Sequence, residues 1–318
     1  MTIVGGFLGS GKTSYLREAL AGAANTAVIV NEFGAVGLDH HLLLATQERV
    51  ELVGGGCACC MRRADLAAAL RRLLDDRDRG HTPLGRVVIE TSGLADPAPI
   101  VFTVATDPML RHHFAVDRVI VTVDAVNAHE QLASQPETAK QVAVADELII
   151  TKTDLVTSEA LQSLTTSLAA LNPSAMVRTA LHGVVAERPL RAASMRAPAP
   201  GHMLATGHTD DVHQLSLEPD GAVDWLGFSV WLSMLLHAHG ERVLRVKGVV
   251  EIEPGGHVAV NAVQHVVHRP EHLPPGSEFC GRSKIVFITR GLAVHGFAQS
   301  LAAFQQLSRA PRGQVQAR

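Results

Sequence analysis

A glycine-rich segment near the start of the chain has the spacing of a phosphate-binding loop. Glycines let the backbone turn successive N–H groups toward an anion, and a helix that follows points its positive end at the same place. In such a loop the lysine reaches the β- and γ-phosphates, and the hydroxyl of the next residue binds Mg²⁺. The segment therefore predicts a nucleoside triphosphate site, against the plain alternative of a glycine-rich turn. It reads Gly6-Phe7-Leu8-Gly9-Ser10-Gly11-Lys12-Thr13-Ser14.

Two carboxylates are candidates for the metal and the attacking water. Glu90 follows the apolar run 87–89, and in phosphate-binding folds a carboxylate at such a strand end faces Mg²⁺. Gly93 comes three residues later and can bring a backbone N–H to the γ-phosphate. Asp39 lies after the apolar run 27–30, where it can approach the metal or the attacking water. We expect Lys12, Glu90 and Asp39 to be the catalytic residues, with Thr13 and Glu90 on Mg²⁺.

The segment Thr151-Lys152-Thr153-Asp154 follows the apolar run 148–150 and can recognise a base. A carboxylate here can accept hydrogen bonds from the N1–H and 2-amino groups of guanine, a pair of donors that adenine lacks. The stem of Lys152 can lie across the plane of the base while its charge stays in water. Thr151, Lys152 and Asp154 are therefore predicted to bind a guanine base.

Three of the four cysteines fall on one glycine-rich loop, Gly54-Gly55-Gly56-Cys57-Ala58-Cys59-Cys60. Cysteines this close rarely satisfy disulfide geometry, whereas their thiolates can bind a soft metal. Zn²⁺ needs a fourth ligand, for which Glu32, His40, His41 and water are candidates. Co²⁺ accepts the same donors and Cu(I) needs only two or three thiolates. A redox role and simple burial of three small residues are the alternatives.

The surrounding elements can position these groups on one sheet. Short apolar runs alternate with helical stretches over residues 1–180, which favours an α/β fold with a doubly wound, mostly parallel sheet. We expect a nucleotide-binding domain over 1–182. The expected strands are 2–5, 27–30, 50–53, 87–89, 119–123 and 148–150, and the clearest helices are 12–20 and 64–79.

The pattern changes after residue 182. Residues 183–211 are rich in Pro, Gly, Ala and His without a clear period, and we expect a linker there. A smaller α+β domain with a mainly antiparallel sheet is expected over 212–308, and a flexible tail over 309–318. Its expected elements are strands 212–217, 242–252, 257–267 and 284–289, a helix from the cap Asp224 to about 239, and a helix over 294–307.

Composition narrows the class of protein. A hydrophobic content of 47% over 318 residues is enough for one large domain or two ordinary ones with real cores. The net charge of −3 gives no basic footprint for nucleic acid or for an acidic membrane surface. No apolar run approaches the length of a membrane span, and no signal peptide is evident. We expect a cytoplasmic protein, able to form oligomers.

With these segments in this order, the chain resembles the CobW family of P-loop GTPases. The matching segments are residues 6–13, 31–39, 56–60, 90–97 and 152–154, and two stretches of the C-terminal part, 245–248 and 264–268, are also similar. The resemblance implies GTP hydrolysis with Mg²⁺, a transition-metal site on the cysteine loop, and transfer of Zn²⁺ or Co²⁺ to a client metalloprotein. Cys57, Cys59, Cys60 and Glu32 would then be the metal ligands.

The resemblance has one departure in the base-binding segment and leaves two alternative functions open. Thr151 stands where the family usually has an asparagine that buttresses the segment predicted to bind the base (the base loop, residues 151–154), and Thr can form hydrogen bonds too. The leading hypothesis is a GTPase metallochaperone that turns over slowly without metal or a partner. The first alternative is a nucleotide-dependent metal sensor or store with negligible hydrolysis, and the second is an ATP-using enzyme.

Overall fold

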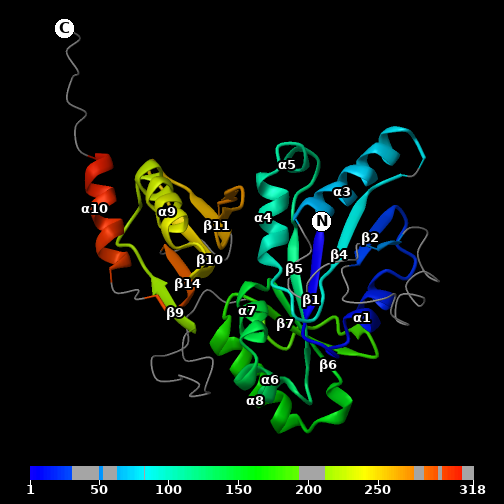
Figure 1. The fold of residues 1–318 in the computed structure, drawn as a ribbon. Helices are drawn as coiled ribbons and strands as arrows, with labels where there is room; N and C mark the ends of the chain where they lie inside the picture. The colour runs from blue at the N-terminus through cyan, green and yellow to red at the C-terminus, as the bar shows by residue number, and fades with distance from the viewer. Residues whose placement is uncertain are drawn as a thin grey trace. The chain divides into compact units, whose positions relative to one another are not determined.

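A computed structural model describes residues 1–30, 50–52, 63–81, 83–192, 212–275, 283–292 and 296–309 (Figure 1). These residues form two compact units, which divide near residue 211. Each unit has its own sheet, so each is described by itself.

The first unit contains an eight-stranded sheet in the order β3-β2-β4-β1-β5-β6-β7-β8. Neighbouring strands pair in parallel except β8, which pairs antiparallel with β7. The inner strands are buried along almost their whole length, as expected of a sheet covered on both faces. The strands are β1 (Thr2–Gly6), β2 (Thr26–Val30), β3 (Val50–Leu52), β4 (Arg86–Glu90), β5 (Arg118–Asp124), β6 (Glu147–Thr151), β7 (Met176–Leu181) and β8 (Val184–Val185).

Within the described residues, helices connect β1 to β2, β3 to β4, β4 to β5, β5 to β6 and β6 to β7, as parallel pairing requires. The chain leaves β1 toward β2 on one side and later returns to β5 on the other, so the direction of winding reverses beside β1. Ligands in open α/β sheets bind at such a switch point, beyond the carboxyl ends of the strands. The helical segments are α1 (Lys12–Ala19), α3 (Arg63–Asp78), α4 (Ala98–Thr106), α5 (Leu110–His113), α6 (Ala128–Ser134), α7 (Pro136–Val144), the 3₁₀ turn η1 (Thr153–Leu155) and α8 (Ser158–Leu171).

The second unit has a six-stranded antiparallel sheet in the order β12-β11-β10-β14-β9, with β13 also paired to β11. Its core includes Phe228 and Trp231 of one helix, Phe287 of a strand and Phe297 of the other helix. The elements are β9 (Val212–Leu217), α9 (Trp225–His239), β10 (Val243–Glu251), β11 (His257–Val263), β12 (Val266–Val267), β13 (Glu271–Leu273), β14 (Lys284–Arg290) and α10 (Phe297–Arg309).

The expected fold class is confirmed in both units, with local differences. Asp224 caps α9 as predicted, because its carboxylate accepts a 2.7 Å hydrogen bond from the Gly227 amide. The single strand expected over 257–267 is wrong: Gln264 has a φ of 49°, which ends β11 and turns β12 back against it. Residues 184–185, within the range expected as linker, form β8.

Candidate nucleotide site

The predicted phosphate loop joins the end of β1 to the start of α1. Gly9 and Gly11 adopt left-handed backbone angles, with φ of 74° and 86°, which a residue with a Cβ rarely adopts. A Cβ on Gly6 would lie 2.6 Å from the Ser10 hydroxyl, so this glycine is required by close packing. The loop therefore turns as a phosphate cradle must, directly before the positive end of a helix.

Buried hydroxyl groups tie the phosphate loop to the neighbouring strand. The Ser10 and Thr122 hydroxyls are 2.7 Å apart, and Thr122 on β5 donates to the Gly5 carbonyl at 3.3 Å. Ser10 is fully buried and Thr122 nearly so. Thr122 was not among the predicted site residues, because only strand pairing brings it beside the loop.

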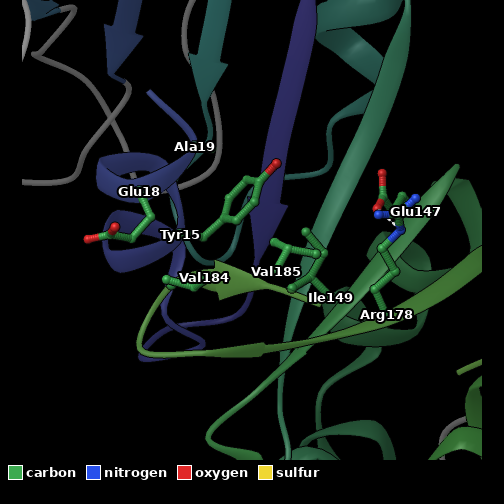
Figure 2. Close-up of a pocket in the computed structure, with 9 residues that line it drawn as sticks. Tyr15, Glu18, Ala19, Glu147, Ile149, Arg178, Val184 and Val185 are labelled. Carbon is green, nitrogen blue, oxygen red and sulfur yellow. Dashed lines mark ion pairs between the residues drawn. The ribbon is translucent and has the colours of Figure 1, made fainter. Parts of the chain in front are cut away.

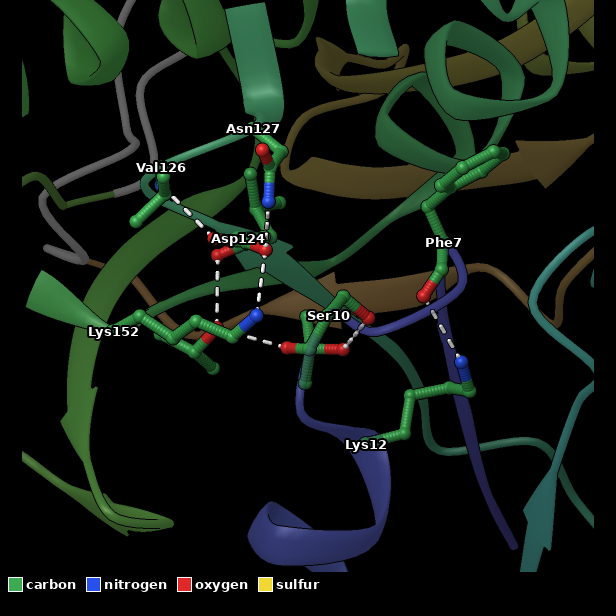
Figure 3. A network of polar contacts seen from close by, with 10 residues as sticks. Phe7, Ser10, Lys12, Asp124, Val126, Asn127 and Lys152 are labelled. Atoms are coloured by element: carbon green, nitrogen blue, oxygen red, sulfur yellow. Dashed lines mark hydrogen bonds and ion pairs between the residues drawn. The ribbon is translucent and has the colours of Figure 1, made fainter.

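Lys12 lies with its ammonium against the loop that it was predicted to serve. Its Nζ donates to the carbonyl oxygens of Gly6 and Phe7, at 2.9 and 3.1 Å (Figure 3). A cation held at the rim of a loop of backbone N–H groups can reach a phosphate there by rotation of its flexible stem. Ser14, also expected at this site, is exposed in the first turn of α1.

The two groups predicted to bind Mg²⁺ lie together. The Thr13 hydroxyl, at the start of α1, is 3.4 Å from Oε1 of Glu90 at the end of β4. Glu90 is 6% exposed, so its carboxylate is directed into the site rather than into solvent. One hydroxyl and one carboxylate oxygen suit Mg²⁺, which usually takes one or two protein carboxylates and completes its shell with water and phosphate. The residues present thus fit the ion.

The loop after β4 packs on the phosphate loop. Gly93 is buried there, and a Cβ on it would lie 2.7 Å from the backbone nitrogen of Leu8. The Thr91 amide donates to the Val4 carbonyl of β1 at 2.9 Å. Gly93 therefore lies directly against the phosphate loop, and its contact with a terminal phosphate stays a prediction.

Thr151 links the base loop to the phosphate loop. Its hydroxyl donates to the Ser10 carbonyl at 2.8 Å and lies 3.3 Å from the Val123 carbonyl. Lys152 follows with a left-handed φ of 56°, and Asp154 is exposed on η1. The predicted base-binding residues therefore stand at the carboxyl end of β6, and the threonine forms the buttress usually made by asparagine.

Asp124 is a buried carboxylate that the sequence reading did not assign to the site. It ends β5 and is 1% exposed (Figure 3). The Lys152 ammonium lies 2.7 Å from its Oδ2, and Asn127 donates to the same oxygen at 2.8 Å. The Val126 amide donates to Oδ1 at 2.9 Å. The available signal was an aspartate ending an apolar strand at the same edge as Glu90.

The charge state of Asp124 follows from these contacts. Burial acts to raise the pKa of this carboxyl, but the hydrogen bonds from Lys152, Asn127 and the Val126 amide lower it below its usual value. Asp124 is therefore ionised at neutral pH and holds the Lys152 side chain beside the base loop.

The remaining predicted site residues cannot be placed. Glu32, Asp39, Cys57, Cys59 and Cys60 lie outside the described residues, as do the alternative ligands His40 and His41. Within the described part of the chain, His, Cys, Asp and Glu side chains form no group of three or more that could hold a metal.

A separate pocket of about 360 Å³ lies on another face of α1 (Figure 2). It is lined by Tyr15 and Glu18 of α1, the Glu147–Arg178 ion pair, and the β7–β8 turn. None of the residues that line it belongs to the phosphate loop or to segment 151–154. It is distinct from the phosphate loop and is not the nucleotide site.

Comparison with known proteins places both units in families. Residues 1–179 match the CobW/HypB/UreG nucleotide-binding domain, and residues 212–305 match the cobalamin synthesis protein CobW C-terminal domain. No helix in the described part of the chain has the length and apolar character to span a membrane.

Several relatives cover much of the chain. The zinc chaperone YjiA of Escherichia coli is 34% identical over 262 residues, which are 80% of this chain and 82% of YjiA. The zinc-regulated GTPase metalloprotein activator 1 of Schizosaccharomyces pombe is 32% identical over 58% of this chain and 46% of its own length. A crystal structure of Zn(II)-bound YjiA GTPase from E. coli matches with a TM-score of 0.70 and 29% identity, covering 95% of this chain and 98% of YjiA. The chain therefore belongs to the CobW/HypB/UreG family and carries the CobW C-terminal domain.

Proposed function

We propose that the protein is a GTP-hydrolysing metallochaperone that binds a transition metal, Zn²⁺ first and Co²⁺ second, and transfers it to a client metalloprotein. The observation that carries the GTPase part is the meeting of Thr13 and Glu90 at 3.4 Å beside the phosphate loop. Relatives named as zinc chaperones and as a zinc-regulated GTPase activator support the metal part. The reducing cytoplasm suits a cluster of free thiols.

The proposed reaction uses water to release phosphate from GTP. Water oxygen forms a bond to the γ-phosphorus, the bond from that phosphorus to the β–γ bridging oxygen breaks, and GDP leaves with the bridging oxygen. The proton that the water loses passes to the released phosphate. The loop N–H groups and the Lys12 ammonium stabilise the charge that develops on the phosphates. Mg²⁺, held by Thr13 and Glu90, supplies further charge neutralisation when bound. Asp39 is proposed to orient the water, and Gly93 to contact the γ-phosphate.

Base recognition rests on the geometry around the end of β6. Asp154 is exposed on η1, where its carboxylate can accept from the two donors of guanine. Thr151 and the Lys152–Asp124 pair fix the backbone and the lysine on either side of it. Competition between GTP and ATP for binding tests this point, and a preference for ATP would overturn the guanine assignment.

The metal step is proposed on the cysteine loop, with Cys57, Cys59, Cys60 and Glu32 as ligands. This loop lies in sequence between segment 31–39 and segment 90–97, the two stretches that would respond to the γ-phosphate. Nucleotide state would therefore change the grip on Zn²⁺. Equal Zn²⁺ affinity with GDP and with a non-hydrolysable GTP analogue, measured by chelator competition, would contradict this coupling.

One experiment separates the chaperone from its alternative, a metal sensor or store. Phosphate release is followed over many turnovers with and without Zn²⁺ and client protein, for the wild type and Cys59→Ala. A chaperone shows slow turnover that metal or the client accelerates, and this acceleration is lost in Cys59→Ala. A store shows no more than one turnover under every condition.

A further inference from the structure

Gln141 joins helix α7 to the loop that follows β4. Its Nε2 donates to the Gly93 carbonyl at 3.2 Å and to the Ala95 carbonyl at 2.9 Å. The side chain is only 1% exposed, so the amide donates its hydrogen bonds to this loop rather than to solvent. Two bonds from one amide to carbonyls two residues apart fix both the position and the turn of the loop.

The anchor of this contact is itself held firmly. Asn172, fully buried after α8, donates from its amide to the carbonyl oxygens of Val142, Ala143 and Ala145 at the end of α7. Gln141 immediately precedes that end. The loop after β4 is therefore held through Gln141 by the end of α7, which Asn172 in turn holds. None of these hydrogen bonds involves the phosphate loop.

The loop that Gln141 holds contains Gly93 and directly follows Glu90, the last residue of β4. Gly93 packs on Leu8 with no room for a Cβ, so a small shift of the loop changes its contact with the phosphate loop. The bonds from Gln141 engage the carbonyl oxygens of Gly93 and Ala95 and do not involve the Gly93 N–H. The contact therefore sets where that N–H stands before a γ-phosphate arrives.

Two buried polar atoms near this loop have no hydrogen-bond partner within the described residues: Oε1 of Gln141 and Oγ1 of Thr91. A buried acceptor without a partner costs free energy, and this cost accompanies the glutamine here. The amide is thus poorly explained as core packing and better explained by its two donated bonds.

We propose that Gln141 is a positioning residue that holds the Gly93–Ala95 segment ready for the γ-phosphate and so favours GTP over GDP. The proposal rests on the proposed GTPase function, because it needs a nucleotide whose γ-phosphate meets this loop. Gln141 acts through the loop and touches neither nucleotide nor Mg²⁺.

The test uses the full-length protein with Gln141→Met, which keeps the length of the side chain and removes both donors. Dissociation constants for GDP and for a non-hydrolysable GTP analogue are measured by fluorescence titration, together with kcat and KM for GTP. Loss of two hydrogen bonds predicts roughly tenfold weaker binding of the analogue, GDP affinity within about twofold of wild type, and a kcat reduced roughly tenfold. The ratio of the two affinities is the decisive readout.

A second variant keeps the test decisive if Gln141→Met folds poorly. Gln141→Glu preserves shape and polarity but places a carboxylate against two carbonyl oxygens, so it should reduce the affinity ratio further than Met does. Thr138→Val, a buried change on the same helix, is the matched control and should leave the ratio unchanged.

The outcomes divide cleanly. The proposal is overturned if Gln141→Met and Gln141→Glu weaken the binding of GDP and of the analogue equally, or weaken the binding of neither. Gln141 is then a packing residue. If the wild type binds both nucleotides but hydrolyses no GTP, the proposed function fails while the affinity ratio still decides the role of Gln141.

Discussion

The Thr151 hydroxyl donates a 2.8 Å hydrogen bond to the carbonyl oxygen of Ser10, so the loop for the base and the loop for the phosphates share one contact. In the proposed function a nucleotide spans both loops, so its two ends must be held at a fixed separation. This bond fixes the separation between the base loop and the phosphate loop from within the protein.

Thr151→Val should weaken GDP binding by about fivefold. Valine keeps the shape of threonine but removes a hydrogen bond worth about 1 kcal/mol and leaves the buried Ser10 carbonyl with one partner fewer. Titration with a fluorescent GDP analogue measures the change. Thr165→Val is the control, because its hydroxyl bonds only the Leu161 carbonyl within α8. Unchanged affinity in Thr151→Val would show that the buttress is dispensable.

Asp154→Asn should convert a preference for guanine into a preference for xanthine. The carboxylate is replaced by an amide that offers a donor where guanine also has a donor, so GTP binding should fall roughly 30- to 100-fold. Xanthosine triphosphate should bind the variant more tightly than the wild type. Asp78→Asn, whose side chain is exposed at the end of α3, should leave both affinities as they are. A variant that still prefers GTP would remove Asp154 from the base site.

Gly93→Ala should slow GTP hydrolysis and leave GDP binding nearly unchanged, so that the preference of the protein for GTP over GDP is lost. Its Cβ would stand 2.7 Å from the Leu8 nitrogen, so the loop after β4 must move away from the phosphate loop. We expect at least roughly tenfold slower hydrolysis with GDP affinity nearly unchanged. Gly85→Ala has ordinary 3.5 Å contacts and is the control, with wild-type kinetics expected. Normal hydrolysis by Gly93→Ala would show that this close approach has no role in turnover.

Asp124→Asn should make the protein less sensitive to acid. The folded pKa of Asp124 lies below the unfolded value of about 3.8, so its stabilising contribution is complete above that pH and is lost as the pH falls through the folded pKa. At pH 7, where the wild type has the ionised pair with Lys152, the free energy of unfolding of the variant should be lower by roughly 1–3 kcal/mol.

Thermal unfolding between pH 6 and pH 3 checks this expectation. The difference in melting temperature between wild type and Asp124→Asn should be largest at pH 6 and should shrink as the pH approaches 3. Asp78→Asn, whose side chain is mostly exposed, provides the baseline. A difference that stays constant over this range would mean that the charge of Asp124 does not contribute.

Local patterns were sufficient for most of the fold of the first unit. The apolar runs before Glu90 and Thr151 predicted buried strands, and glycine spacing predicted the turn between β1 and α1. Each of these signals lies within about ten residues of the element it describes. Where the backbone departs from the pattern, as at Gln264 with its positive φ, the sequence has valines on both sides and no glycine or proline, so nothing in it marks the turn.

Other parts of the site depend on pairing between distant segments. Thr122 meets Ser10, and Gln141 meets Gly93, across sequence separations of 112 and 48 residues. Neither residue belongs to a recognisable motif, and each is placed by the order of strands in the sheet. Motifs therefore indicate the residues proposed to contact the ligand and give no signal for the residues that hold them in position.

The strand order β4-β1-β5-β6 also has a consequence for synthesis on the ribosome. The phosphate loop is made first, yet its hydroxyl partner is on β5, its metal-facing carboxylate on β4, and its buttress, Thr151, on β6. A nascent chain that ends before Thr151 lacks a wall of the site, however well its first helix has formed. Nucleotide can therefore stabilise this domain only late in translation, after the polypeptide up to β6 has left the exit tunnel.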